Sequence, residues 1–287
     1  MKKFLIKFLL LSLFTNVFFE GKQANALVPY YYLPSIQNLE RESLSIGKYA
    51  YQLLYFGQTE DSLILARLAV TINQSDEKLW LILSETQIAN KLYEDAFFSL
   101  NKAEKLNPDI SQIYFAKSRL YLKQSKLKKA KISLREGLKI EPKNHNAIFQ
   151  LGNIHLMEED YLKAIKLFEN AYKIKPEFWQ AINNKALAYF EQDKINLSID
   201  FFEKAISLEE NAEPLLGLAS CLSTKDINSA IILAKKALTK NPNYVEYDYR
   251  KEQLWGEKLQ NSTEKLFKNK QLQKDIILAK SKINKTS

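Results

Sequence analysis

Residues no larger than serine recur in three columns along this chain, with a spacing of 34 residues. In units counted from residue 43, they occupy positions 8, 20 and 27, as at Ser84, Ala96 and Ala103 of the second unit. Two antiparallel helices approach closely only where their facing side chains are small. Positions 20 and 27 are seven residues apart and therefore share one helix face. The pattern predicts a helical hairpin in every unit.

Bulky apolar residues alternate with these small ones in the same register. They fall at positions 4 and 24, namely Trp80, Tyr114, Ile148, Ile182, Leu100, Leu134, Phe168 and Phe202. Proline stands at position 32 in three consecutive units, at Pro108, Pro142 and Pro176. We expect the two helices of a unit to be joined by turns near Lys91, Ser125 and Glu159. An ordinary helical bundle with chance spacing is the alternative.

These columns resemble the tetratricopeptide repeat (TPR) family, whose pattern has the same small positions and the same proline. The best unit is NAIFQLGNIHLMEEDYLKAIKLFENAYKIKP, residues 146–176. The resemblance implies an all-α fold, a right-handed α-solenoid of about six helical hairpins over 43–244. The expected units are 43–76, 77–110, 111–144, 145–178, 179–210 and 211–244. Gln74 and Glu210 replace the usual proline, and the sixth unit fits only with loops of altered length.

The two ends of the chain differ from the repeats. Residues 1–26 combine a charged start, a short apolar run and a small-x-small site, which predicts a signal peptide; an uncleaved membrane anchor is the alternative. Residues 27–42, with three tyrosines between two prolines, are expected to form an extended strap over the first hairpin, or an aromatic contact for a partner. Residues 245–287 are expected to form a basic C-terminal capping helix, with partner binding as the alternative.

The resemblance also implies a binding surface, because the first helices of TPR units line a groove. Its candidate peptide-binding residues in this chain are Phe115, Arg119, Phe149, Gln150, Asn153, Asn183 and Asn184. Asparagine can both donate to and accept from a peptide backbone, and phenylalanine can form apolar pockets. Phe149 stands where one TPR subclass has a lysine that binds a terminal carboxylate, so that clamp is incomplete. The expected partner is an extended or helical protein segment.

Positive charge is concentrated in one unit. The chain carries a net charge of +9, and residues 111–144 hold ten lysines and arginines against Glu136 and Glu141. This unit could attract an acidic protein or an anionic membrane surface, or serve as plain solvated surface. No base-reading motif is present, so we expect no nucleic-acid partner.

Residues for catalysis are scarce in this sequence. The histidines are His145 and His155, and the single cysteine is Cys221. Glycine-rich phosphate loops, HExxH motifs and CxxC pairs do not occur. We expect a protein that is not an enzyme and that uses neither a cofactor nor a metal ion.

The composition and N-terminus are similar to those of signal-bearing TPR proteins of marine picocyanobacteria. This resemblance implies an exported protein of the periplasm or thylakoid lumen. The expected function is a scaffold for protein–protein interaction, with assembly of a membrane complex such as a photosystem as its context by analogy. The alternative is a membrane-anchored structural component of an envelope complex.

Overall fold

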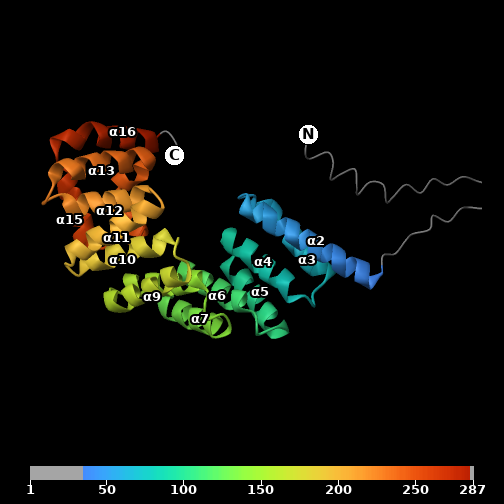
Figure 1. Cartoon of the computed structure of the whole chain (residues 1–287). Coiled ribbons are helices and arrows are strands. Elements are labelled where there is room, and N and C mark those ends of the chain that lie inside the picture. Colours follow the sequence, from blue (N-terminus) through green and yellow to red (C-terminus); the bar gives the residue numbers. More distant parts are fainter. Residues whose placement is uncertain (1–34, 285–287) are drawn as a thin grey trace, which may run out of the picture. The chain divides into compact units, whose positions relative to one another are not determined.

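The computed structural model describes residues 35–284, and this part of the chain is all-α (Figure 1). The predicted signal peptide (1–26) and residues 27–34 of the predicted strap lie outside the described residues. The helices are α2 Ile36–Tyr55, α3 Thr59–Ile72, α4 Glu77–Ala89, α5 Tyr93–Leu106, α6 Ser111–Lys123, α7 Leu127–Ile140, α8 His145–Met157, α9 Tyr161–Ile174, α10 Trp179–Glu191, α11 Ile195–Leu208, α12 Ala212–Leu222, α13 Ile227–Lys240, η1 Pro242–Val245, α14 Tyr247–Glu252, α15 Glu257–Phe267, η2 Lys270–Leu272 and α16 Gln273–Ile283.

The helices pack as the hairpins that the small columns predict, so α4 pairs with α5, α6 with α7, and so on to α12 with α13. The small residues of these columns, five at position 8 and six each at positions 20 and 27, are all buried. Where position 20 is serine, its hydroxyl crosses the hairpin. Ser62 Oγ donates to the carbonyl of Ala50 at 2.7 Å, and Ser198 Oγ donates to that of Ala186 at 2.9 Å. The predicted fold class is confirmed.

The turns inside the hairpins repeat one backbone conformation. Lys91, Ser125, Glu159 and Asp193 all have φ near +60°, and each is 34 residues from the next. At Ser125 the chain makes the paired bonds of a Schellman motif, with Lys126 N–H donating to the carbonyl of Tyr121 at 2.8 Å. Among the turns of residues 35–284, glycine fills this position only at Gly57. The other turns therefore hold an L-residue in a left-handed conformation that costs free energy.

The first helix starts earlier than the sequence predicted. Residues 36–42, expected to be part of an extended strap, are helical, and α2 begins at Ile36. Ser35 provides the reason, because its hydroxyl accepts a hydrogen bond from the N–H of Asn38 at 3.2 Å, as an N-cap does. The residues that follow, Leu39 to Glu42, contain neither glycine nor proline and can extend the helix.

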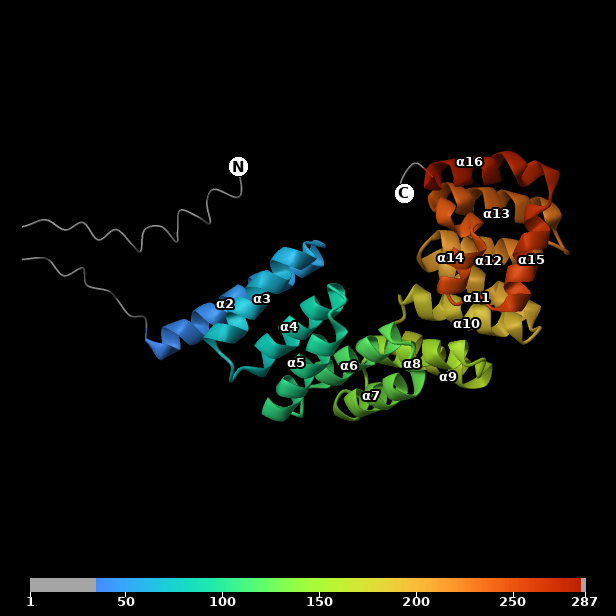
Figure 2. The same cartoon turned by 180° about the vertical axis from the view of Figure 1, so that it is seen from behind.

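The C-terminal segment contains more than one helix. The chain turns at Leu254, with φ +66°, and at the N-cap Gly256, so α14, α15 and α16 are separate. Helix α16 packs on α13 and η1, and the capping role of the segment stays a prediction. Helix α15 instead packs on α12 and α10 (Figure 2). No helix in the described part of the chain is long and apolar enough to cross a membrane.

Candidate functional site

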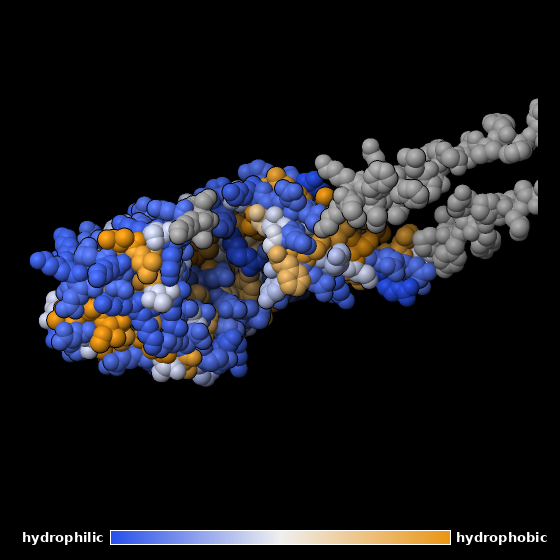
Figure 3. All heavy atoms as spheres, turned by 90° about the horizontal axis from the view of Figure 1, so that it is seen from above, coloured by the Kyte–Doolittle hydropathy of each residue, from blue (hydrophilic) through white to orange (hydrophobic). Residues whose placement is uncertain are grey.

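The first helices of the first three units carry one groove residue each at position 9. These are Tyr51 on α2, Glu85 on α4 and Arg119 on α6, spaced 34 residues apart. Because the helices stack in register, these side chains lie around one pocket of ≈ 410 Å³. The remaining lining residues are Leu81, Ile82, Gln112 and Phe115. Hydrophobic surface lies beside hydrophilic surface over the N-terminal helices in the view from above (Figure 3).

The pocket combines an apolar floor with an ion pair. Leu81, Ile82 and Phe115 supply the apolar lining, and the guanidinium of Arg119 pairs with the carboxylate of Glu85. Burial lowers the pKa of Arg119, whereas the neighbouring Tyr51 raises it. An arginine remains charged in a protein nevertheless. The pocket can therefore take an apolar side chain and still offer charged hydrogen-bonding groups to a peptide backbone.

Phe115 owes its position to a glycine on the following helix. A Cβ atom built on Gly137 of α7 would lie 2.4 Å from Cε1 of Phe115, closer than real atoms approach. The phenyl ring therefore packs closely against the α7 backbone at Gly137 and is almost fully buried, while still lining the pocket. Glycine at this site permits the close approach that alanine would prevent.

Phe149 and Gln150 lie outside this pocket. The ring of Phe149 contacts those of Phe168 and Phe178, with centroids 5.6 Å and 5.0 Å away. It therefore contributes to the packing of its own and the next hairpin. Gln150 has a buried Oε1 to which none of the described residues donates a hydrogen bond. The sequence placed both residues with Phe115 and Arg119, and the structure does not bring them together.

The three asparagines form a chain of hydrogen bonds instead of an open surface. Asn184 Nδ2 donates to Asn153 Oδ1 at 2.8 Å, and Asn183 Nδ2 donates to Asn184 Oδ1 at 3.0 Å. Asn183 is fully buried and Asn184 nearly so. Their amides are therefore engaged within the protein, which differs from the peptide-binding arrangement expected from the sequence.

The C-terminal segment covers this part of the groove. The indole N–H of Trp255 donates to the carboxylate of Glu213 on α12 at 3.1 Å, and Thr263 Oγ1 lies 2.7 Å from Ser220 Oγ. Leu259, Thr263 and Leu266 form the buried face of α15. The groove faces of α10 and α12 are thus occupied by a helix of the same chain.

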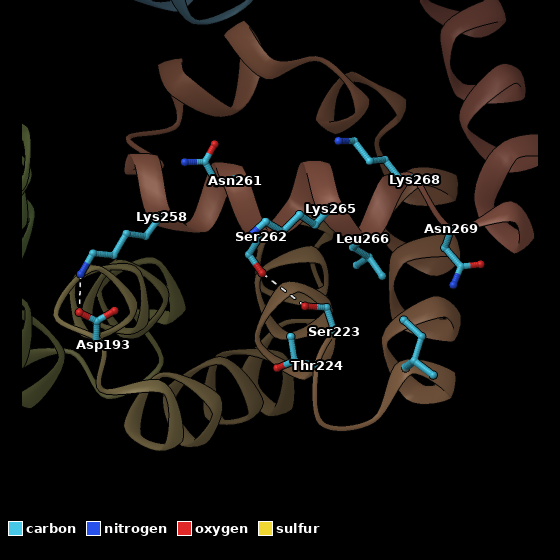
Figure 4. A pocket seen from close by; sticks show the side chains of 11 residues that line it. Asp193, Ser223, Thr224, Lys258, Asn261, Ser262, Lys265, Leu266, Lys268 and Asn269 are labelled. Atoms are coloured by element: carbon cyan, nitrogen blue, oxygen red, sulfur yellow. Dashed lines mark hydrogen bonds and ion pairs between the residues drawn. The ribbon is translucent and has the colours of Figure 1, made fainter.

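A second pocket, of ≈ 660 Å³, lies between α15 and the turn from α12 to α13 (Figure 4). Its lining residues are polar or charged except for Ile227 and Leu266. Lys258 reaches across to Asp193, and the hydroxyls of Ser223 and Ser262 lie 3.3 Å apart. These contacts join α15 to the repeats. The pocket is therefore a gap at the interface between α15 and the repeats.

Five of the pocket residues were not predicted from the sequence, namely Tyr51, Leu81, Ile82, Glu85 and Gln112. The candidate residues come from the central units alone, and Gln112 lies at position 2 of one of these units. Applying position 9 to the first two units would have found Tyr51 and Glu85, because they share the spacing of Arg119.

The titratable residues of the described chain form no site that could hold a metal ion. His155 is buried, with Nδ1 3.5 Å from Oδ2 of Asp160, and burial lowers its pKa. Cys221 is buried too, and burial raises its pKa to about 12.

Comparison with known proteins supports the repeat assignment. The tetratricopeptide repeat family model matches residues 111–144, 145–178 and 180–211. The structure of Pseudomonas aeruginosa PilF is similar, with a TM-score of 0.64 and 16% identity over 75% of this chain and 98% of that one.

Two further solved structures resemble the chain. The type IV pilus biogenesis factor PilW has a TM-score of 0.58 and 17% identity over 76% of this chain and 97% of that one. MamA has a TM-score of 0.51 and 21% identity over 61% and 93%. No curated protein matches the sequence. Tetratricopeptide repeats are typically non-catalytic scaffolds for protein–protein interaction. The three central units of the chain, residues 111–144, 145–178 and 180–211, therefore match the tetratricopeptide repeat model, and the fold of the described residues is that of stacked helical hairpins.

Proposed function

We propose that this chain is a non-catalytic scaffold that binds a segment of another protein in the pocket between α2, α4 and α6. The observation that carries this proposal is the pocket itself, which pairs an apolar floor with the Glu85–Arg119 ion pair. It is open, whereas the groove faces of α10 and α12 are covered by α15.

The chemistry of the pocket defines the segment that fits. A bulky apolar side chain would contact Leu81, Ile82 and Phe115, and its burial would supply about 1.5–3 kcal/mol. Gln112, Glu85 and Arg119 would bond the polar backbone on either side, in an extended or a helical segment. Asn153 continues the row of position-9 residues beyond Arg119.

We also propose that the protein is exported, to a periplasm or a thylakoid lumen, and there assists assembly of a membrane complex such as a photosystem. The support is the charged, apolar and small-residue order of residues 1–26, together with the similarity to signal-bearing cyanobacterial TPR proteins.

A photo-crosslinking amino acid at Tyr51 or Gln112, both on the pocket lining, tests the binding proposal in the source cells. We expect the same discrete adduct from both positions, and its loss when Arg119→Glu is added. The same amino acid at the exposed Lys166 on α9 is the control. Equal adducts from position 166, or adducts that are indifferent to Arg119→Glu, would contradict a partner bound in this pocket.

The alternative is a structural component of an envelope complex, anchored by an uncleaved N-terminus. The unit 111–144 favours it, because α7 exposes several cations, such as Lys128 and Arg135, to an acidic protein or an anionic membrane surface. Flotation of the full-length protein with membranes after a salt wash would support this alternative. Complete release by salt, with Leu27 as the first residue, would support the exported scaffold.

A further inference from the structure

One buried carboxylate joins the covering segment to the repeats. Glu213, at the start of α12, is buried, and it accepts the indole N–H of Trp255 at 3.1 Å. The side-chain amide of Asn183 on α10 and the hydroxyl of Tyr244 on η1 also bond to it. A single side chain thus holds together α10, α12, η1 and the turn that precedes α15.

The groups that face Glu213 are neutral. Trp255, Asn183 and Tyr244 donate hydrogen bonds, and Tyr249 lies behind Tyr244, with ring centroids 5.0 Å apart. Two cations on the neighbouring elements pair with other residues. Arg250 on α14 bonds Gln260 and pairs with Glu264, and Lys258 on α15 pairs with Asp193. Burial therefore raises the pKa of Glu213 to about 7, although its hydrogen bonds lower it.

A second carboxylate holds the start of α15. Glu191, at the end of α10, accepts the backbone N–H groups of Lys258 at 3.2 Å and Leu259 at 3.0 Å. A Cβ on Gly256 would lie 2.2 Å from Cδ of Glu191, so the close contact depends on that glycine. Burial raises the pKa of Glu191; the two N–H groups and Lys258 lower it, and Asp193 raises it.

We propose that residues 246–267 form a latch, which covers the groove faces of α10 and α12 in mildly acidic solution and opens as the pH rises. A buried site without a compensating cation favours the neutral carboxyl group. The closed latch therefore binds this proton more tightly than the open latch does.

The direction of the pH effect follows from this difference in proton binding. The contribution of Glu213 to closure is complete below its ordinary pKa of 4.5 and is lost as the pH rises through about 7. Opening would uncover the groove faces of α10 and α12, so pH would set how many repeats present an open groove. The latch is independent of the pocket between α2, α4 and α6.

Hydrogen exchange of the full chain tests the latch. Between pH 5.5 and 8.5, after correction for intrinsic exchange rates, the opening equilibrium of α15 should rise about 30-fold if Glu213 titrates at 4.5 when open and at about 7 when closed. Glu213→Gln should remove most of the rise, because glutamine does not ionise. Glu257→Gln, an exposed carboxylate in the first turn of α15, is the matched control and should keep it.

A disulfide provides a second test that does not depend on Glu213. Ser220→Cys with Thr263→Cys, in a Cys221→Ser background, should block opening when oxidised and restore it when reduced. The proposal is overturned if wild-type α15 shows no rise, or if Glu213→Gln keeps the full rise. It is also overturned if α8 and α9 open in step with α15, or if the oxidised chain still opens as the pH rises.

Discussion

The groove of this protein has two halves built from the same repeat, and they differ in what covers them. Tyr51, on the first helix of the first unit, is 55% exposed, whereas Asn183, on the first helix of the fifth unit, is 0% exposed. The first lines an open pocket, and the second lies beneath the C-terminal segment. Repeat register therefore places a side chain on the groove face. Segments beyond the repeats decide whether a partner can reach it.

The largest effect should come from removing the side chain that orders the covering segment. Arg250 is fully buried and donates to Gln260 Oε1 at 2.7 Å and to the carbonyls of Tyr244 at 2.7 Å and Val245 at 3.0 Å. Arg250→Ala leaves these acceptors without a donor and should destabilise the segment by about 3 kcal/mol.

Hydrogen exchange would show this as loss of protection in α14 and α15, while α4 and α6 keep theirs. Lys251→Ala, an exposed neighbour on α14, is the control and should change neither half. Equal loss of protection in both halves would contradict the division of the groove into an open half and a half covered by a separate segment.

A smaller effect is expected where the open pocket meets α7. Gly137→Ala would force the Phe115 ring off the helix backbone, at a cost of about 1–3 kcal/mol, and should weaken the crosslink from position 51. Urea unfolding and the crosslinking yield measure the two effects.

Phe115→Leu combined with Gly137→Ala should recover most of the stability, since Leu81 and Ala103 occupy the same positions in the preceding unit. Gly217→Ala is the matched variant in the covered half, where a Cβ would lie 2.4 Å from Phe202. It should cost similar stability and leave the crosslink from position 51 unchanged. Loss of that crosslink in Gly217→Ala would contradict the independence of the two halves.

The smallest effect concerns the left-handed turns. Ser125→Gly should stabilise the chain by about 0.5–1 kcal/mol, because glycine adopts a φ of +57° without a steric penalty. Asp193→Gly should raise the stability by a few tenths of a kcal/mol less than Ser125→Gly does. The reason is that it also removes the surface ion pair to Lys258, which helps to hold α15. Thermal unfolding of the two variants compares them, and equal gains would mean that the Asp193–Lys258 pair contributes nothing to closure.

Local periodicity explains why so much of the fold could be predicted from the sequence. The columns at positions 8, 20 and 27 report contacts within a hairpin or between neighbouring hairpins, and each contact recurs with the same residue type. The turns at Lys91, Ser125 and Glu159 follow from the same count. The start of α2 was missed because Ser35 acts as a single N-cap that no repeat position encodes.

The covering of α10 and α12 by the C-terminal segment could not be predicted, because the contacts that hold the segment occur once and do not follow the repeat. Glu191 meets the N–H of Leu259 across 68 residues of chain, and Glu213 meets Trp255 across 42, with no repeat of either contact. The asparagines have the spacing of groove residues, which predicts that they bind a peptide. The buried Asn183 shows that the spacing gives the position and that tertiary contacts decide the accessibility.

The row Tyr51, Glu85, Arg119 and Asn153 gives each of four successive units a different chemical group at one equivalent place: a phenol, an acid, a base and an amide. A protein segment bound along the row would contact these four groups in a fixed order. Its sequence would therefore need a complementary residue at each of the corresponding places. Replacing one of these four residues would then change the preference for one residue of the partner and leave the preferences at the other three positions intact. Each unit would thus contribute its own part of the selectivity for the partner sequence.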